Sequence, residues 1–210
     1  MKNDFIKRFL SSIILIPISF FFIIKGSFIL NFFLIICFFI TVYEWFKMIK
    51  KNYIKLIGLI FIIFSFYSIY KIRNDFDGDY LYLLFVLITC VSTDIGGYVF
   101  GKLFGGPKLI KISPKKTYSG SLGSYIFSII FSYIYINFLN NDYSINILIF
   151  VLLISTISQI GDIFISYFKR LSKIKDTGKI IPGHGGLLDR IDGMIFAFPF
   201  SYLIFLNWTF

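Results

Sequence analysis

Residues Ser158–Gly193 read SQIGDIFISYFKRLSKIKDTGKIIPGHGGLLDRIDG, a polar stretch set between two strongly apolar runs. It contains the only histidine of the chain and four of its 11 acidic residues. Six lysines and arginines accompany them, together with a glycine-rich turn. Carboxylates, cations and backbone-exposing glycines in one segment predict a phosphate-handling, metal-assisted site.

The composition around this stretch predicts a membrane protein. Of the 210 residues, 57% are hydrophobic, and the mean hydropathy is +0.82, whereas soluble chains average about 45–50% apolar residues. The net charge of +10 raises nucleic acid as a partner in a soluble chain. Here the cations lie between apolar runs, so we expect a lipid bilayer and no nucleic acid as the partner.

Seven apolar segments are long enough, or nearly so, to cross a bilayer, which needs about 20 residues. They are Phe9–Ile24, Phe28–Phe46, Ile54–Tyr70, Tyr80–Phe100, Ser121–Leu139, Ile145–Phe168 and Gly193–Trp208. With a cytoplasmic N-terminus, alternating spans place 18 of the 21 lysines and arginines on the cytoplasmic side. The sequence therefore predicts an all-α, polytopic membrane protein with about seven transmembrane helices and an outer C-terminus.

An acidic turn near Asp75 divides the predicted chain into two regions. Residues 1–75 are interpreted as scaffold helices, and residues 76–210 as the catalytic membrane region. Within the first region Glu44 is the polar exception, at the end of an apolar run beside Trp45. We interpret this pair as an interfacial anchor, because such residues are enriched where a helix leaves the bilayer.

Two carboxylates fall inside apolar segments, Asp94 and Asp162. A charge at membrane depth costs at least about 2.5–3.5 kcal/mol, so it usually faces a cation, a metal or a cavity. Asp94 precedes several glycines, and a protonated Asp94 among packing glycines is the structural alternative. Four residues, spaced to share one helix face, continue toward the cytoplasm: Asp162, Ser166, Lys169 and Arg170. Snorkelling at a helix end explains the two cations but not the acid.

Two loops add donors suited to an anion. Ser113, Lys115, Lys116 and Thr117 precede a predicted helix, where an anion is favoured. A basic loop that sets topology, with Ser121 capping the helix, explains the same residues, and the sequence leaves both open. In the second loop glycines flank His184, while Asp189 and Asp192 begin the last helix. An all-oxygen set with Asp162 favours Mg²⁺.

In the order and spacing of these motifs the chain resembles the phosphatidate cytidylyltransferases, also called CDP-diacylglycerol synthases. The resemblance covers about half the chain. Its matching residues are Asp94, Gly96, Tyr98, Gly101, Phe104, Gly105, Ser113, Pro114, Lys115, Lys116, Thr117, Gly120, Ser166, Lys169, Arg170, Lys175, Asp176, Pro182, His184, Gly185, Gly186, Asp189, Arg190 and Asp192. There are two departures: Ile165 stands where the family usually has an acid, and Gly193 where it commonly has a serine. The missing acid leaves open a weaker metal site and altered activity.

The resemblance implies transfer of a cytidylyl group from CTP to phosphatidate, with Mg²⁺ as cofactor and the site at the cytoplasmic face of the inner membrane. It implies three sets of residues. Catalytic roles fall to Asp162, Asp189, Lys169, Arg170, His184 and Arg190; substrate contacts to Lys115, Lys116, Ser113, Thr117, Ser166, Lys175, Asp176, Gly185 and Gly186; metal ligation to Asp162, Asp189, Asp192 and Asp94.

Two other functions remain as alternatives. A CTP-dependent polyprenol or phytol kinase resembles this family in its C-terminal half, and a membrane transporter would use intramembrane acids as an ion relay. The concentration of polar residues at one membrane face argues against a transporter. A second, monovalent cation and a homodimer are left open.

Overall fold

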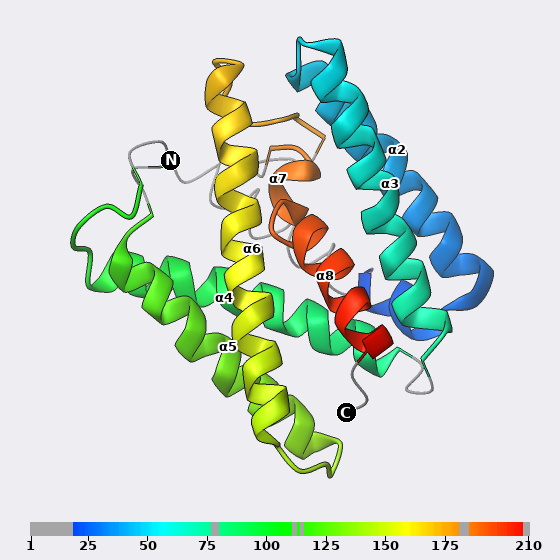
Figure 1. Cartoon of the computed structure of the whole chain (residues 1–210), viewed down its shortest axis with the longest axis vertical. Helices are drawn as coiled ribbons and strands as arrows, with labels where there is room; N and C mark the ends of the chain where they lie inside the picture. Colours follow the sequence, from blue (N-terminus) through cyan, green and yellow to red (C-terminus); the bar gives the residue numbers. More distant parts are fainter. Residues whose placement is uncertain (1–18, 77–79, 111–112, 114–115, 181–184, 208–210) are drawn as a thin grey trace. The chain divides into compact units, whose positions relative to one another are not determined.

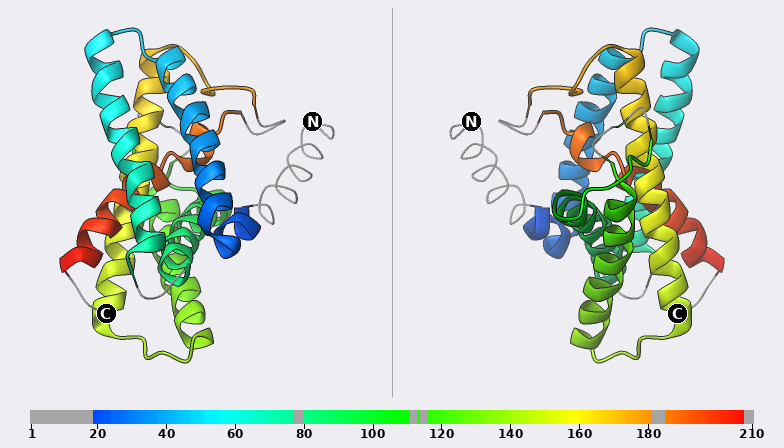
Figure 2. Two further views of the ribbon diagram at one scale, coloured as in Figure 1. Left: turned by 90° about the vertical axis from the view of Figure 1, so that its right-hand side faces the viewer. Right: turned by 90° about the vertical axis from the view of Figure 1, so that its left-hand side faces the viewer.

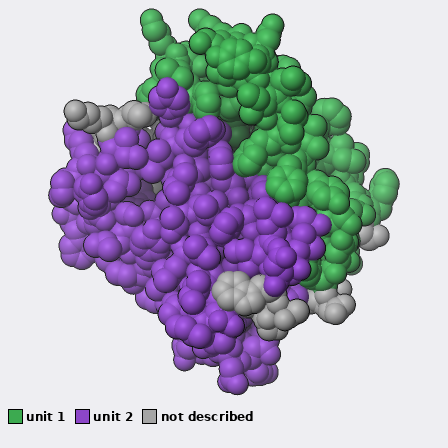
Figure 3. All heavy atoms as spheres, in the orientation of Figure 1, with its two compact units in different colours: residues 1–80, 168–192 green, residues 81–167, 193–210 purple. Residues whose placement is uncertain are grey.

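The computed structural model describes residues 19–76, 80–110, 113, 116–180 and 185–207 (Figure 1). Throughout these ranges the regular elements are helices, and an isolated β-bridge joins Lys108 and Thr117. The prediction of an all-α, multi-pass membrane protein is confirmed. The chain forms two compact units, residues 1–80 with 168–192 and residues 81–167 with 193–210 (Figure 3).

Among the described residues, five helices are long and apolar enough to cross a membrane. They are α2 (Ser27–Met48), α3 (Asn52–Asn74), α4 (Leu81–Leu103), α5 (Tyr118–Phe138) and α6 (Ile145–Leu171). These match the second to sixth predicted segments. The first falls largely outside the described residues, which are helical over 19–25. The seventh appears as α8 (Met194–Asn207), whose 14 described residues are shorter than a full span and contain Pro199.

In the first unit α2 and α3 lie side by side as an antiparallel pair, as both sets of views show (Figures 1 and 2). The Phe38 and Phe66 rings meet edge to face, with centroids 5.6 Å apart. At the other end the indole of Trp45 fits over Gly58, where an added Cβ would lie 2.1 Å from the indole ring. The Trp45 Nε1 donates to the Lys55 carbonyl at 3.3 Å. Trp45 is therefore a packing residue between two helices, only 4% exposed.

In the second unit α4 and α5 form a close antiparallel pair. Their backbones meet at glycines: a Cβ on Gly96 would lie 2.2 Å from the Gly123 carbonyl oxygen, and one on Gly120 would lie 2.8 Å from that of Gly97. The Ser124 hydroxyl donates to the Thr93 carbonyl at 2.8 Å. Small residues at such a contact let two membrane helices approach closely, which is the main source of helix association in lipid.

Helices α6 and α8 complete the second unit through polar and aromatic contacts. Ser121 of α5 donates to Gln159 of α6 at 2.6 Å, and Tyr125 and Thr156 share a hydrogen bond of 2.9 Å. Phe150 of α6 is fully buried and contacts Phe205 of α8, with ring centroids 5.0 Å apart.

The two units divide the chain differently from the two predicted regions. The break near Tyr80 lies close to the predicted one, but residues 168–192 pack with the N-terminal helices. The segment that carries Lys169 and Asp189 thus shares a unit with α2 and α3. Whether residues 1–75 act only as a scaffold stays a prediction.

Candidate functional site

The site in the first unit begins where α6 ends. Lys173 adopts φ 56°, its amide donates to the Arg170 carbonyl, and the Ile174 amide donates to the Lys169 carbonyl, both at 3.0 Å. This paired arrangement closes the helix as a Schellman motif and satisfies two of its terminal carbonyls. The Ser172 hydroxyl donates at 2.7 Å to the Met48 carbonyl, in the last turn of α2. The end of α6 is thereby tied to the end of α2.

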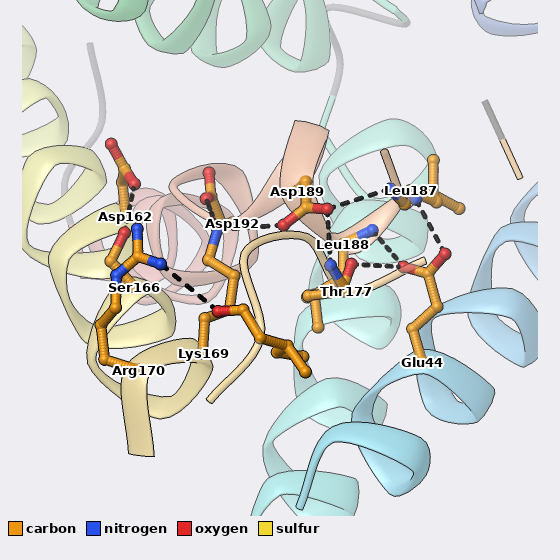
Figure 4. A network of polar contacts seen from close by, with 12 residues as sticks. Glu44, Asp162, Ser166, Lys169, Arg170, Thr177, Leu187, Leu188, Asp189 and Asp192 are labelled. Atoms are coloured by element: carbon orange, nitrogen blue, oxygen red, sulfur yellow. Dashed lines mark hydrogen bonds and ion pairs between the residues drawn. The ribbon is translucent and has the colours of Figure 1, made fainter. Parts of the chain in front are cut away.

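Asp189 is the centre of a cluster of charges in this unit (Figure 4). It lies in the short helix α7 (Leu188–Ile191). Its Oδ1 accepts from Lys169 Nζ at 2.9 Å, and its Oδ2 accepts from the backbone amides of Thr177 at 2.8 Å and Gly186 at 2.9 Å. Asp192 Oδ2 lies 3.7 Å from the same ammonium. Two carboxylates thus converge on one cation.

These charged side chains are removed from solvent. The side chains of Lys169 and Asp189 are 11% and 5% exposed, respectively. Burying a charge is costly unless it is paired and hydrogen-bonded. The pairing explains why this lysine, placed on an otherwise apolar helix, points inward rather than snorkelling.

Glu44 is a further buried carboxylate, and it contacts the same loop. It is fully buried. Its Oε2 accepts from the Leu188 amide at 2.8 Å and from the Thr177 hydroxyl at 3.0 Å, and its Oε1 accepts from the Leu187 amide at 3.1 Å. Thr177 is therefore held by both carboxylates, by its hydroxyl to Glu44 and by its amide to Asp189 (Figure 4).

The interpretation of Glu44 and Trp45 as an interfacial anchor pair is wrong. Both side chains are buried in the first unit, and Glu44 satisfies backbone donors more than 140 positions away in the chain. The sequence did offer a signal for it. The cost of a carboxylate in an apolar helix, which singled out Asp94 and Asp162, applies equally to Glu44.

Glycines of the loop make room for these carboxylates. A Cβ on Gly186 would lie 2.2 Å from Thr177 Oγ1 and 2.4 Å from Glu44 Oε2, and one on Gly178 would lie 2.4 Å from Glu44 Oε1. Gly185 has φ +90°, and its Cβ would lie 2.8 Å from Asp189 Oδ2. The sequence predicts that Gly185 and Gly186 contact a phosphate; in the structure the Gly186 amide donates to Asp189.

Asp162 and its partners lie in the second unit. Its Oδ2 is 2.5 Å from Lys116 Nζ, and its Oδ1 accepts from the Ser166 hydroxyl at 3.3 Å. The predicted contact between Asp162 and Ser166 on one helix face is present. Lys169, from the same predicted face, instead pairs with Asp189. Ile165, at the position where an acid was expected, is buried and 4% exposed.

The donor loop before α5 is organised by Thr117 rather than Ser121. Thr117 is the N-cap of α5, and its Oγ1 accepts from the Gly120 amide at 3.1 Å. Ser121 lies within the first turn and pairs with Gln159, so the suggestion that it caps the helix is wrong. The Lys116 amide donates to the Ser113 carbonyl at 3.0 Å, which turns the loop. Lys115 lies outside the described residues.

The remaining predicted residues are more peripheral. Arg170 donates to the Ile174 carbonyl at 3.3 Å. Arg170 is exposed, and so are Lys175, Asp176, Arg190 and Asp94. Asp94 belongs to α4 of the second unit, and His184 lies outside the described residues.

The donor chemistry can be compared with the predicted magnesium site. Within the described parts of the chain, no three acidic, histidine or cysteine residues group closely enough to hold a metal. Asp189 and Asp192 do fit as a pair of hard oxygen donors, because both already face one cationic atom. Asp94 and Asp162 belong to the other unit, and the four-residue ligand set stays a prediction.

The comparisons with known proteins agree with the sequence motifs. The model of the Cytidylyltransferase family matches residues 53–208. A protein of Rickettsia bellii (strain RML369-C) named phosphatidate cytidylyltransferase is 34% identical over 97% of this chain and 91% of its own length. Proteins of the same name from Staphylococcus haemolyticus and Haemophilus influenzae are 38% and 44% identical over 60% and 59% of this chain. The chain matches about half the length of these two relatives, 49% and 45%. The resemblance inferred from the motifs is confirmed, and the chain belongs to the Cytidylyltransferase family.

Proposed function

We propose that this chain is a phosphatidate cytidylyltransferase. A phosphate oxygen of phosphatidate would attack the α-phosphorus of CTP, and the bond from that phosphorus to the oxygen bridging the α- and β-phosphates would break. The products are CDP-diacylglycerol and pyrophosphate. The observation that carries the proposal is the match to the Rickettsia relative of that name over nearly the whole of both chains.

The residue chemistry suits this reaction. The phosphatidate phosphate is already an anion near neutral pH, so the nucleophile needs no strong general base. Catalysis then rests on positioning and on neutralising phosphate charge. Lys169 offers a buried ammonium in the first unit, and Lys116 offers a partly exposed one beside Asp162 in the second. Each is held in place by a carboxylate, so little side-chain ordering is needed when an anion arrives.

We further propose Mg²⁺ as the cofactor, with Asp189 and Asp192 among its ligands and with Asp162 and Asp94 as the sequence predicts. The ion would neutralise triphosphate charge and favour departure of pyrophosphate. Asp189 is well prepared for such a role, because two backbone amides fix the direction of its carboxylate. We place the site at the cytoplasmic face of the inner membrane, where the predicted basic loops gather.

The proposal is tested with the purified full chain in lipid nanodiscs. Labelled CTP and phosphatidate should yield a labelled lipid together with pyrophosphate, and chelation of Mg²⁺ should stop the reaction. Asp189→Asn should lower the rate at least about 100-fold, whereas Asp142→Asn, at an exposed loop position, should leave it unchanged. Release of CDP with phosphorylation of a lipid alcohol would instead support the kinase. The absence of both products would refute a nucleotide-dependent enzyme.

A further inference from the structure

We propose that Glu44 is a positioning residue for Asp189, acting through the loop between α6 and α7. This inference rests on the proposed function for its catalytic consequence, but its structural half stands on contacts alone. Glu44 belongs to α2, far from the polar segment in sequence, and no motif of the sequence analysis includes it.

Glu44 joins two parts of the chain that lie far apart along the loop between α6 and α7. Thr177 lies within the loop, Leu187 ends it and Leu188 is the first residue of α7; Glu44 accepts hydrogen bonds from all three. Asp189 also joins these two parts of the loop, because its carboxylate accepts from the amides of Thr177 and Gly186. Two carboxylates, those of Glu44 and Asp189, therefore hold the two parts of the loop together.

Thr177 links the carboxylates of Glu44 and Asp189, because it donates to both. Thr177 offers its hydroxyl to one and its amide to the other, with donor–acceptor distances of 3.0 and 2.8 Å. The Leu188 amide, held by Glu44, immediately precedes Asp189 in the chain. A shift of the Glu44 carboxylate therefore moves both the donors of Asp189 and its backbone.

The surroundings of the Glu44 side chain suit a carboxylate, because hydrogen-bond donors contact both of its oxygens. Glu44 is fully buried, and both Gly178 and Gly186 leave the space that its oxygens occupy. A buried carboxylate is tolerated where donors compensate it, and here backbone amides and a hydroxyl do so. Because an amide side chain carries an N–H pair, Glu44→Gln must turn a donor toward one of these donors.

The test compares Glu44→Gln with Thr41→Val in the full chain in nanodiscs. Thr41 is also fully buried in α2, one turn earlier, and its hydroxyl donates to the Cys37 carbonyl of the same helix. Hydrogen exchange measured by mass spectrometry reports on the loop without any need for activity. In Glu44→Gln, protection of the amides of Thr177, Leu187 and Leu188 should fall about 10-fold to 100-fold. Amides of α5 should be unchanged, and Thr41→Val should affect neither region.

Steady-state kinetics test the catalytic half. Glu44→Gln should lower kcat at least about tenfold while the KM for phosphatidate changes less than about twofold, since misplacing a catalytic group lowers the rate more than binding. Thr177→Val should lower kcat in the same way, Thr177→Ser should recover most of it, and Thr177→Val should add little to Glu44→Gln.

The outcomes separate the two proposals. A wild-type protein without cytidylyl transfer refutes the proposed function, while exchange still decides whether Glu44 holds the loop. Unchanged loop protection in Glu44→Gln overturns the inference. So does an unchanged kcat in an active enzyme, or a loss of protection that extends equally to α5, because the effect is then general unfolding.

Discussion

The buried ion pair between Lys169 and Asp189 makes a quantitative prediction about stability. Lys169→Met removes the ammonium and keeps the length of the side chain. It leaves Asp189 Oδ1 without its closest cation and removes the charge that lies 3.7 Å from Asp192. Both partners are at least 89% removed from solvent by their side-chain exposures of 11% and 5%, so solvent screening is weak.

Truncating one partner of a buried ion pair typically costs about 3–5 kcal/mol. Asp189 keeps its two backbone donors in this variant, so we expect a smaller loss than that, about 2–3 kcal/mol of unfolding free energy. Asp189→Asn keeps an oxygen for those amides but turns its NH₂ toward the ammonium, and we expect about 2 kcal/mol. In the double variant both charges of the pair are gone, so neither is left buried without its partner. The coupling energy between Lys169 and Asp189 should therefore be at least about 1 kcal/mol.

Unfolding in mixed detergent micelles, followed by circular dichroism, measures these values for the four proteins of the cycle. Lys173→Met is a matched control, because Lys173 is an exposed lysine just beyond the same helix. It should change the stability by less than about 0.5 kcal/mol. Additive effects of Lys169→Met and Asp189→Asn, within about 0.5 kcal/mol, would show that the two charges do not interact and would refute the reasoning.

Three further predictions follow from single contacts. Gly186→Ala should destabilise the protein by about 2–3 kcal/mol in the same unfolding assay, because its Cβ would lie 2.4 Å from Glu44 Oε2; an unchanged midpoint would contradict that packing. Lys116→Met should cost at most about 1 kcal/mol of stability, because the Lys116–Asp162 pair is 22% and 31% exposed, and should still lower kcat/KM for CTP; a variant with full activity would remove Lys116 from the proposed site. A reporter fused to the C-terminus should be accessible from the outer face of intact cells, as the distribution of lysine and arginine predicts; labelling only after the membrane is opened would show that the span count is wrong.

The helices were predictable because their signal is local. A run such as Phe28–Phe46 has few alternatives in a bilayer, since every backbone polar group must be satisfied within the segment. In the structure the helix begins one residue before that run and ends two residues after it, at Ser27–Met48. The seventh segment was harder to predict, because hydropathy alone does not show how a helix accommodates an internal proline such as Pro199.

The partners of charged residues were not predictable from spacing. Asp162, Ser166 and Lys169 share a helical face, yet Lys169 turns to Asp189 and Asp162 takes Lys116. Which opposite charge an ammonium meets depends on how other segments pack, and helical periodicity carries no information about that. Glu44 shows the same limit: its burial was foreseeable from the cost of a carboxylate in an apolar helix, but its loop partners were not.

The glycine contacts of α4 and α5 bear on how the second unit can move. A Cβ added at Gly96, Gly120 or Gly123 would lie 2.2, 2.8 or 2.7 Å from a carbonyl oxygen of the facing helix, and so close a backbone approach also permits weak Cα–H···O bonds. Sliding one helix along the other would drive Phe127 or Phe100 into the space now filled by hydrogen atoms alone, since both side chains border these glycines. We therefore expect α4 and α5 to move together as one rigid body. Any movement that admits a lipid headgroup should then occur in the segments that connect this pair to the rest of the chain.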